Sequence, residues 1–171
     1  IRAIFNLILK KIGKLKEEAH KHRIRFRHLG RKDRMPENLM KELKRLEEET
    51  FDYSDLNVQL MLDYGGRDEI IRAVKKILKA KVKKIDEGTF TDYLDSKDIP
   101  DPDLIIRTSG EQRTSGAMPF QAAYSELYFA DVYFPEFGAE EFRKAIRSFS
   151  ERVRRFGGTA KEDLHHGKKQ R

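Results

Sequence analysis

The stretch NVQLMLDYGGRDEIIRAVKKILK, residues 57–79, decides the fold because it joins a strand to a helix through a short glycine turn. Residues 57–64 are rich in aliphatic side chains and predict a strand. Two glycines, residues 65–66, predict a tight turn, and the apolar spacing of residues 67–79 predicts a helix that has two acids in its first turn. Such a strand–turn–helix unit is typical of α/β proteins.

Three segments precede this unit. Residues 1–15 have helical apolar spacing, yet no capping residue precedes them, so the chain is expected to begin inside a helix. Basic and apolar side chains alternate over residues 23–29, which predicts a strand with one basic face. Residues 36–51 predict an amphipathic helix with proline in its first turn. The apolar residues of the first helix are Ile4, Phe5, Ile8, Ile12 and Leu15, and the basic face holds Arg23, Arg25 and Arg27.

The segments that follow repeat the alternation. Residues 104–106 predict a short strand apolar enough for burial on both faces, residues 126–134 an aromatic strand, and residues 139–155 a helix. We therefore expect an α/β fold with a mostly parallel central sheet and helices on both faces, with ligands bound at the carboxyl ends of the strands. Residues 1–158 are expected to form one domain and residues 159–171 a disordered basic tail.

Composition narrows the function classes. The 171 residues carry a net charge of +7 and no cysteine, so a zinc–thiolate site and a disulfide framework are excluded. No apolar run is long enough to span a bilayer, which favours a cytoplasmic protein. Residues 1–45 hold 15 Lys and Arg against 5 Asp and Glu, an excess that could attract nucleic acid, anionic lipid or phosphorylated substrates, or simply solvate helix faces. His165 and His166 are more typical of a tail than of a metal site.

The loop after the strand at residues 104–106 contains the tetrad Arg-Thr-Ser-Gly twice, at residues 107–110 and 113–116. Guanidinium groups match phosphate oxygens, hydroxyls add short hydrogen bonds, and glycine lets backbone N–H groups approach an anion. Two such tetrads could hold a diphosphate. The alternative is a solvated loop whose arginines pair with neighbouring acids, for which the candidates are Asp101, Asp103 and Glu111.

Glu126 opens the next predicted strand. A carboxylate there could join Mg²⁺ to a bound diphosphate, because magnesium prefers oxygen ligands and keeps several waters. The alternative is an ordinary acid at a strand end.

The segment PDPDLIIRTSGEQRTSGAMPFQAAYSELYF, residues 100–129, resembles the signature of the cis-prenyltransferases, a family that includes undecaprenyl diphosphate synthases. Three further segments agree in collinear order: RIRFRHLG at residues 23–30, NVQLMLDYGGRDEIIRAV at residues 57–74 and ERVRRFGG at residues 151–158. The resemblance implies the family's α/β fold and transfer of the prenyl group of an allylic diphosphate onto isopentenyl diphosphate, with release of inorganic diphosphate. The allylic diphosphate ionises, the isopentenyl double bond attacks, and a proton is lost in cis geometry.

The resemblance also implies roles for individual residues. Arg107, Arg113 and Ser115 would bind the diphosphate of isopentenyl diphosphate, and Glu126 would ligate Mg²⁺. Arg155 and Gly157 resemble an R-x-G element that reaches toward the partner's active site, which implies a homodimer. Gly65, Gly66 and Arg67 resemble a turn with a structural role. Ile4, Phe5 and Ile8 would wall the hydrophobic tunnel for the growing chain, or form plain core.

Two departures from the family pattern stand out. The 171 residues lack two of the family's blocks: D-G-N-R, which supplies the catalytic aspartate, and S-x-E-N-W. No catalytic residue is therefore identified in this chain. The chain alone is expected to be an inactive, amino-terminally truncated form. Ala117 and Phe120 stand where bulky apolar and Trp residues are usual.

Two rival functions remain. The chain could be a non-catalytic partner subunit of a heteromeric enzyme, against which the complete loop from Arg107 to Ser115 argues. It could also be a basic nucleic-acid-binding domain that uses the arginines of residues 23–27, but it lacks an RNA-binding signature and aromatics on that face, so we expect no nucleic-acid partner. A peripheral membrane contact through the lipid product is also left open.

Overall fold

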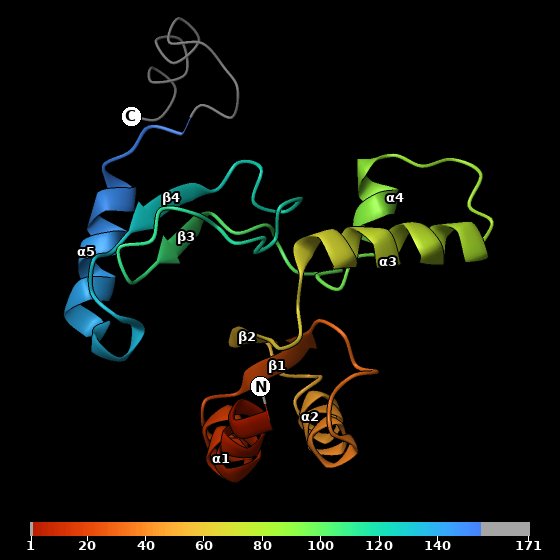
Figure 1. The fold of residues 1–171 in the computed structure, drawn as a ribbon, viewed down its shortest axis with the longest axis horizontal. Helices are drawn as coiled ribbons and strands as arrows, with labels where there is room; N and C mark the ends of the chain where they lie inside the picture. The colour runs from red at the N-terminus through yellow and green to blue at the C-terminus, as the bar shows by residue number, and fades with distance from the viewer. Residues whose placement is uncertain (1, 155–171) are drawn as a thin grey trace, which may run out of the picture. The chain divides into compact units, whose positions relative to one another are not determined.

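The computed structural model describes residues 2–154 (Figure 1). The chain divides into two compact units between Ile99 and Pro100. Each unit has helices and one pair of parallel strands, so the predicted α/β class with parallel strands is confirmed. The strands form two separate pairs in the described residues, because no strand of one unit pairs with a strand of the other. The expectation of one domain over residues 1–158 concerns how the units join and stays a prediction.

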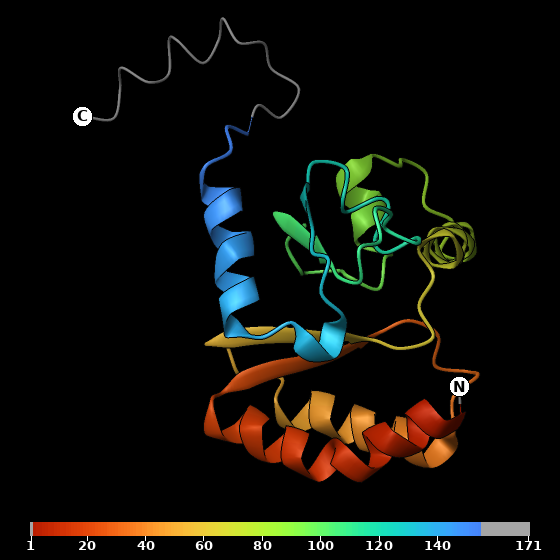
Figure 2. The same ribbon diagram turned by 60° about the vertical axis from the view of Figure 1, so that its left-hand side comes forward.

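The first unit is built on a pair of parallel strands covered by two helices. Strands β1 and β2 pair in parallel from Ile24 opposite Leu56 to Leu29 opposite Met61. Both views show α1 and α2 beneath the same face of this pair (Figure 1, Figure 2). The bounds are α1 Arg2–Lys21, β1 Ile24–Leu29, α2 Glu37–Glu49 and β2 Leu56–Met61. Arg23, expected on the basic face of the strand, instead precedes β1 with a φ of 47°.

The core of this unit lies where α1 and α2 meet the inner face of β1. Phe26 projects from β1 into a cluster formed by apolar side chains of both helices, and Leu39, Leu43 and Leu46 of α2 are fully buried. Phe5 and Ile8 pack against this cluster from α1, as plain core would, whereas Ile4 is 57% exposed. The apolar spacing read from the sequence therefore predicted the packed faces of both helices except at Ile4.

Side chains satisfy the outer edge of β1. The N–H group of Phe26 donates to Thr50 Oγ1 at 3.0 Å, that of His28 to Glu47 Oε1 at 2.7 Å, and that of Gly30 to Asp95 Oδ2 at 3.2 Å. Buried backbone donors need such acceptors, and these three close the edge against a further strand. Gly30 has a φ of 124°, and a Cβ there would lie 2.2 Å from the carbonyl oxygen of Leu62, so only glycine fits.

The predicted helix after β2 is α3, Gly66–Lys79, and a short helix α4 spans Glu87–Thr91. Gly65 is the N-cap of α3 in an extended conformation. Two acids, Glu69 of α3 and Asp95 after α4, are held by hydrogen bonds. Glu69, 1% exposed, accepts from Tyr64 Oη and from the N–H of Asp95. Asp95 in turn binds both terminal nitrogens of Arg72, at 2.7 and 2.6 Å.

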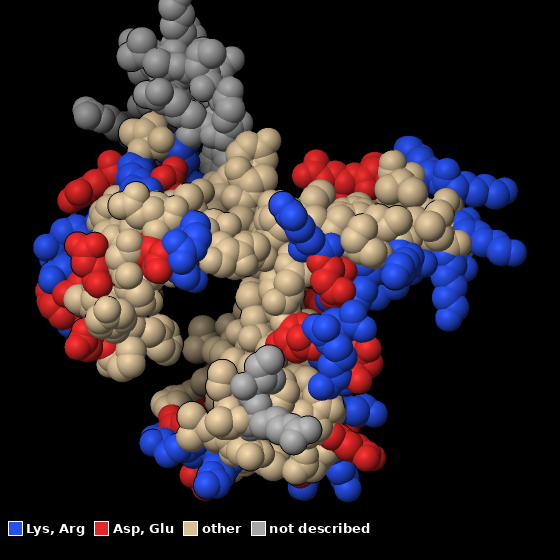
Figure 3. All heavy atoms as spheres, in the orientation of Figure 1, with Lys and Arg blue, Asp and Glu red and all other residues tan. Residues whose placement is uncertain are grey.

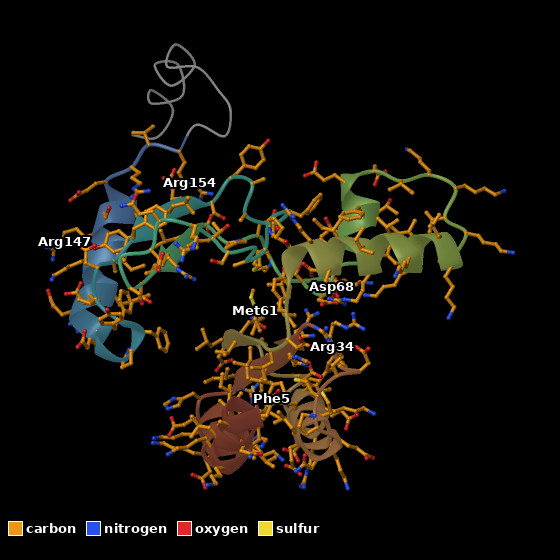
Figure 4. All side chains as sticks on the ribbon, in the orientation of Figure 1. Phe5, Arg34, Met61, Asp68, Arg147 and Arg154 are labelled. Carbon is orange, nitrogen blue, oxygen red and sulfur yellow. The ribbon has the colours of Figure 1, made fainter. Side chains whose placement is uncertain are left out.

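Further ion pairs tie the loops after β1 and β2 to the start of α3. Arg31 bridges Asp33 and Asp68, and Arg34 binds Asp63 through two hydrogen bonds. Figure 4 shows Arg34 and Asp68 on the same side of this unit. The carboxyl edge of the β1–β2 pair is thus fixed by arginine–carboxylate contacts.

The second unit pairs β3, Leu104–Arg107, in parallel with β4, Glu126–Phe129, and packs α5, Ala139–Ser150, against β4. A 3₁₀ turn spans Phe134–Glu136. The predicted strand over residues 126–134 was wrong in length: β4 ends at Phe129 because its partner β3 is only four residues long.

The predicted helix over residues 139–155 was also too long. Helix α5 ends at Ser150, after which Arg152 and Arg154 form ion pairs with acids near the strands instead of continuing the helix. No helix in residues 2–154 combines the length and apolar character needed to cross a membrane.

Candidate functional site

The repeated tetrad forms a repeated backbone conformation. Ser109 and Gly110 have φ values of 72° and 64°, and Ser115 and Gly116 have φ values of 51° and 77°. Each Ser-Gly pair therefore lies in the left-handed region, which turns the chain sharply twice within one loop. The first turn is anchored beyond β4, because the N–H groups of Ser109 and Gly110 donate to the carbonyls of residues 132 and 130 at 2.8 and 3.0 Å.

Arg107 is the last residue of β3 and leads into this loop. Its Nε is buried and donates no hydrogen bond to any atom in residues 2–154. An unpaired buried donor costs about 1–3 kcal/mol. The guanidinium thus lacks one acceptor, at the carboxyl end of a parallel strand where α/β proteins bind ligands.

Arg113 and Ser115 lie in the second half of the loop. Arg113 forms an ion pair with Glu111, as the surface-loop alternative anticipated for one of these acids, and its side chain is mostly exposed. Among the described residues, the backbone N–H groups of Ser115 and Gly116 have no hydrogen-bond acceptor. The second tetrad therefore offers two backbone donors and one exchangeable guanidinium.

Glu126 lies at the other end of the strand pair. It stands opposite Leu104, three residues before Arg107, so the backbone of Glu126 is displaced from that of Arg107 by about 10 Å along the strands. Its carboxylate accepts a hydrogen bond from Arg152 Nη1 at 2.8 Å, and both side chains are about one-third exposed. A cation at Glu126 would compete with this guanidinium for the carboxylate.

Arg154 anchors the same segment through three contacts. It forms an ion pair with Asp103, donates to the carbonyl of Tyr124 at 3.4 Å, and lies over the ring of Phe149 at 5.7 Å. Figure 4 shows Arg154 between the end of α5 and β4. Asp103 and Glu126 are joined through the backbone, because the N–H of Glu126 donates to the carbonyl of Asp103 at 2.9 Å. Within the described residues the Arg152 side chain has one partner, Glu126, and the Arg154 side chain has at least three, so Arg152 is the more exchangeable of the two.

Sequence reasoning missed Asp131, two residues past the end of β4. Its Oδ1 lies 3.8 Å from the position that a Cβ would take on Gly110, beside the first Ser-Gly turn. The available signal was an acid just after a predicted parallel strand, but the expected strand over residues 126–134 placed it inside the strand. Two carboxylates, Glu126 and Asp131, thus flank opposite ends of β4.

The described residues do not form a protein-only metal cage. No group of three or more His, Asp or Glu side chains within residues 2–154 is arranged to hold a metal ion. Magnesium commonly binds through one or two carboxylates together with substrate phosphates and water. Glu126 supplies a single carboxylate, which is compatible with that mode only where a ligand provides further oxygens.

Several predicted residues take no part in this loop. Gly65, Gly66 and Arg67 belong to the start of α3 in the first unit. The predicted substrate-binding residues Arg155 and Gly157, together with the predicted tail, lie outside the described residues.

Comparison with known proteins identifies the family. The model of the undecaprenyl diphosphate synthase family matches residues 1–157 of this chain. An isoprenyl transferase of Aquifex aeolicus is 43% identical over 157 residues, which cover 92% of this chain and 68% of the relative. A tritrans,polycis-undecaprenyl-diphosphate synthase (geranylgeranyl-diphosphate specific) of Thermococcus kodakarensis is 45% identical and covers 92% of this chain and 62% of that relative. This chain therefore spans about two-thirds of the length of these relatives.

Solved structures agree. A probable undecaprenyl diphosphate synthase from Campylobacter jejuni superposes with a TM-score of 0.82 at 33% identity, covering 92% of this chain and 74% of that one. Lavandulyl diphosphate synthase from Lavandula x intermedia, in complex with dimethylallyl diphosphate, gives a TM-score of 0.82 at 32% identity. The match covers 91% of this chain and 69% of that one. Sequence and structure thus lead to one conclusion: the chain belongs to the undecaprenyl diphosphate synthase family of prenyltransferases.

Proposed function

We propose that this chain carries the isopentenyl diphosphate site of a cis-prenyltransferase, which joins isopentenyl diphosphate to an allylic prenyl diphosphate to make a long cis-polyprenyl diphosphate. Arg107, Arg113 and Ser115 bind the diphosphate of isopentenyl diphosphate. The names of the relatives, isoprenyl transferase and undecaprenyl-diphosphate synthase, support this reaction class.

The observation that carries the proposal is the unsatisfied guanidinium at the carboxyl end of β3. Arg107 Nε is buried without an acceptor in the described part of the chain, and the N–H groups of Ser115 and Gly116 also lack acceptors there. A diphosphate supplies several acceptor oxygens at once, and charge-assisted hydrogen bonds to such oxygens are about twice as strong as neutral ones. The anion therefore restores the hydrogen bonds that the loop leaves unmade.

Magnesium is the proposed cofactor, with Glu126 as its protein ligand. When bound, it would neutralise the charge that develops on a departing diphosphate. Arg152 holds the Glu126 carboxylate at 2.8 Å in its absence, so cation binding exchanges one positive partner for another. Arg113 releases Glu111 in the same way when it turns to the diphosphate.

We further propose a homodimer in which Arg155 and Gly157 contribute to the partner's site, on the basis of their match to the family's R-x-G element. A cytoplasmic location is part of the same proposal.

Calorimetric titration of isopentenyl diphosphate into the chain, with and without Mg²⁺, tests the diphosphate site. Saturable binding is expected in the parent, and an Arg107→Ala, Arg113→Ala double variant is expected to lose it, because both guanidinium groups are removed. Charged hydrogen bonds of this kind contribute about 1.5–3 kcal/mol each, so affinity should fall at least a hundredfold.

The matched control is an Arg143→Ala, Arg147→Ala variant of α5, which removes the same charge from the exposed face of a helix in the same unit. It is expected to bind isopentenyl diphosphate like the parent. Equal loss in both double variants would mean that net charge, not the loop, attracts the ligand, and no binding by the folded parent would contradict the proposed site.

A further inference from the structure

A stretch of the first unit carries positive charge, most of which is not paired with a described acid. Residues 70–85, IIRAVKKILKAKVKKI, contain one arginine, six lysines and no Asp or Glu. Arg72 is bound to Asp68 and Asp95, and Lys76 donates to the carbonyl of Tyr93 at 3.0 Å. The remaining five lysines are exposed and form no ion pair with another described residue. We call this set the lysine cluster: Lys75, Lys79, Lys81, Lys83 and Lys84.

The end of α3 brings the lysine cluster together. The N–H of Lys81 donates to the carbonyl of Leu78 at 3.2 Å, and the N–H of Val82 to that of Ile77 at 3.3 Å. These two bonds are those of a Schellman motif, which folds the chain back at the end of a helix. The lysines after the turn thus return toward those of the last helical turn, and Figure 3 shows blue side chains gathered at this end of α3.

Lys81 occupies the position of this motif where glycine is usual. Its φ of 54° is left-handed, a conformation that disfavours residues with a Cβ. Glycine would form the same turn without this strain but would remove one charge from the cluster. Lys81 therefore adds a positive charge to the cluster at a position where the backbone conformation favours glycine.

Aliphatic side chains are exposed among these lysines. Leu78 is 70% exposed and Ile85 is 56% exposed, whereas the neighbouring Ile77 of α3 is buried. Lysine charges around exposed aliphatic groups fit an anionic bilayer surface, since the ammonium groups meet head groups while the aliphatic groups enter the acyl boundary. A nucleic acid would find neither aromatic rings for stacking nor arginine in the lysine cluster.

We propose that the lysine cluster, with Leu78 and Ile85, is a docking surface for anionic lipid membranes. It acts through phosphate and carboxylate head groups and is separate in sequence from the diphosphate loop. The surface goes beyond the proposed prenyl transfer, but it suits an enzyme whose product is a lipid.

Cosedimentation of the full chain with vesicles tests this surface. One vesicle is phosphatidylcholine alone and the other an equal mixture of phosphatidylcholine and phosphatidylserine. We expect binding only to the anionic vesicle and weakening by salt. A Lys79→Gln, Lys81→Gln, Lys84→Gln variant is expected to lose affinity on the order of a hundredfold, since each lysine near the surface contributes roughly fivefold.

The matched control is a Lys10→Gln, Lys11→Gln, Lys14→Gln variant, which removes the same charge from exposed positions of α1. It is expected to retain binding. A second variant, Leu78→Asn, should weaken the part of binding that persists at high salt, because it removes an aliphatic anchor without changing charge.

Three results would overturn the proposal: no binding of the parent to anionic vesicles, equal loss in the two lysine variants, or tighter binding to a single-stranded oligonucleotide than to the vesicles. Calorimetric binding of isopentenyl diphosphate should be unchanged in the Lys79, Lys81 and Lys84 variant. This measurement separates failure of the membrane surface from failure of the diphosphate site.

Discussion

Thr50 shows how one buried hydroxyl holds two elements of the first unit. It is 0% exposed, accepts the N–H of Phe26 at 3.0 Å and donates to the carbonyl of Leu46 at 2.7 Å. Thr50→Val keeps the shape but leaves the Phe26 donor unpaired, so we expect the free energy of unfolding to fall by about 1–3 kcal/mol. Urea denaturation followed by circular dichroism measures this change. Thr50→Ser keeps the hydroxyl and should cost clearly less, and equal costs would assign the effect to packing.

Arg152 and Glu126 give the second prediction at this scale. Because Arg152 pairs with the Glu126 carboxylate, Arg152→Gln should lower the Mg²⁺ concentration that half-saturates isopentenyl diphosphate binding, by about 1.5- to fivefold for an exposed ion pair. Arg152→Lys keeps the charge and should behave like the parent. The measurement is the calorimetric titration repeated over a series of Mg²⁺ concentrations.

Two carboxylate variants decide which end of β4 holds the cation. Glu126→Gln should abolish the Mg²⁺ dependence, whereas Asp131→Asn should preserve it. The reverse result would move the cation to Asp131, beside the first Ser-Gly turn.

At the scale of elements, Asp95 links β1 to α3 and makes stability depend on pH. Burial alone raises the pKa of its carboxyl, but hydrogen bonds and charge from Arg72, the charge of Lys76 and the N–H of Gly30 leave the pKa below its usual value. A group whose pKa is lower in the folded state contributes its full stabilisation of the fold at pH values above its pKa in the unfolded chain. This contribution is therefore present above about pH 4 and is lost as the pH falls through the folded pKa.

Asp95→Asn should remove this contribution. We expect a loss of about 1–3 kcal/mol at neutral pH, and a stability that changes less than that of the parent as the pH falls below 4. Urea denaturation at a series of pH values measures both effects. Asp55→Asn is the control, because within residues 2–154 the Asp55 carboxylate forms only an exposed pair with Arg23. Identical pH dependence in parent and Asp95→Asn would refute the role of this carboxylate.

The apolar spacing correctly predicted helices whose packing faces lie within one segment. It did not predict helix ends that depend on partners distant in sequence. Helix α3 ends at Lys79 as predicted, since its apolar face and its first-turn acids lie within the segment. Helix α5 stops five residues early because Arg152 and Arg154 bind Glu126 and Asp103, contacts that span 26 and 51 residues of sequence. Spacing along one helix carries no information about such pairs.

The sequence predicted the anion-binding chemistry of the candidate site better than the positions of its residues. The repeated tetrad indicated an anion loop, and its two Ser-Gly pairs adopt matching left-handed turns. The position of Glu126 at the opposite strand end followed from the parallel register with β3, which no local pattern specifies. Asp131 was overlooked because the length of β4 is set by a partner strand of four residues.

At the scale of the whole molecule, binding and turnover should separate. The proposed diphosphate loop lies within this chain, whereas the D-G-N-R block that the family uses for the allylic diphosphate is absent from the 171 residues. We therefore expect the chain to bind isopentenyl diphosphate but to form no prenyl product from radiolabelled isopentenyl diphosphate and geranylgeranyl diphosphate with Mg²⁺. Product formation by the chain alone would show that other residues ionise the allylic substrate.

A fusion distinguishes a missing catalytic block from a subunit role. A segment that carries the family's D-G-N-R block, taken from a relative in the same family, is placed ahead of Ile1. If this chain supplies a competent half-site, the fusion should elongate geranylgeranyl diphosphate, because ionisation and attack then occur beside each other. The same fusion carrying Arg107→Ala and Arg113→Ala should be inactive. A folded fusion that binds isopentenyl diphosphate without elongation would instead favour the non-catalytic subunit, since the diphosphate loop would be intact and only the chemistry lost.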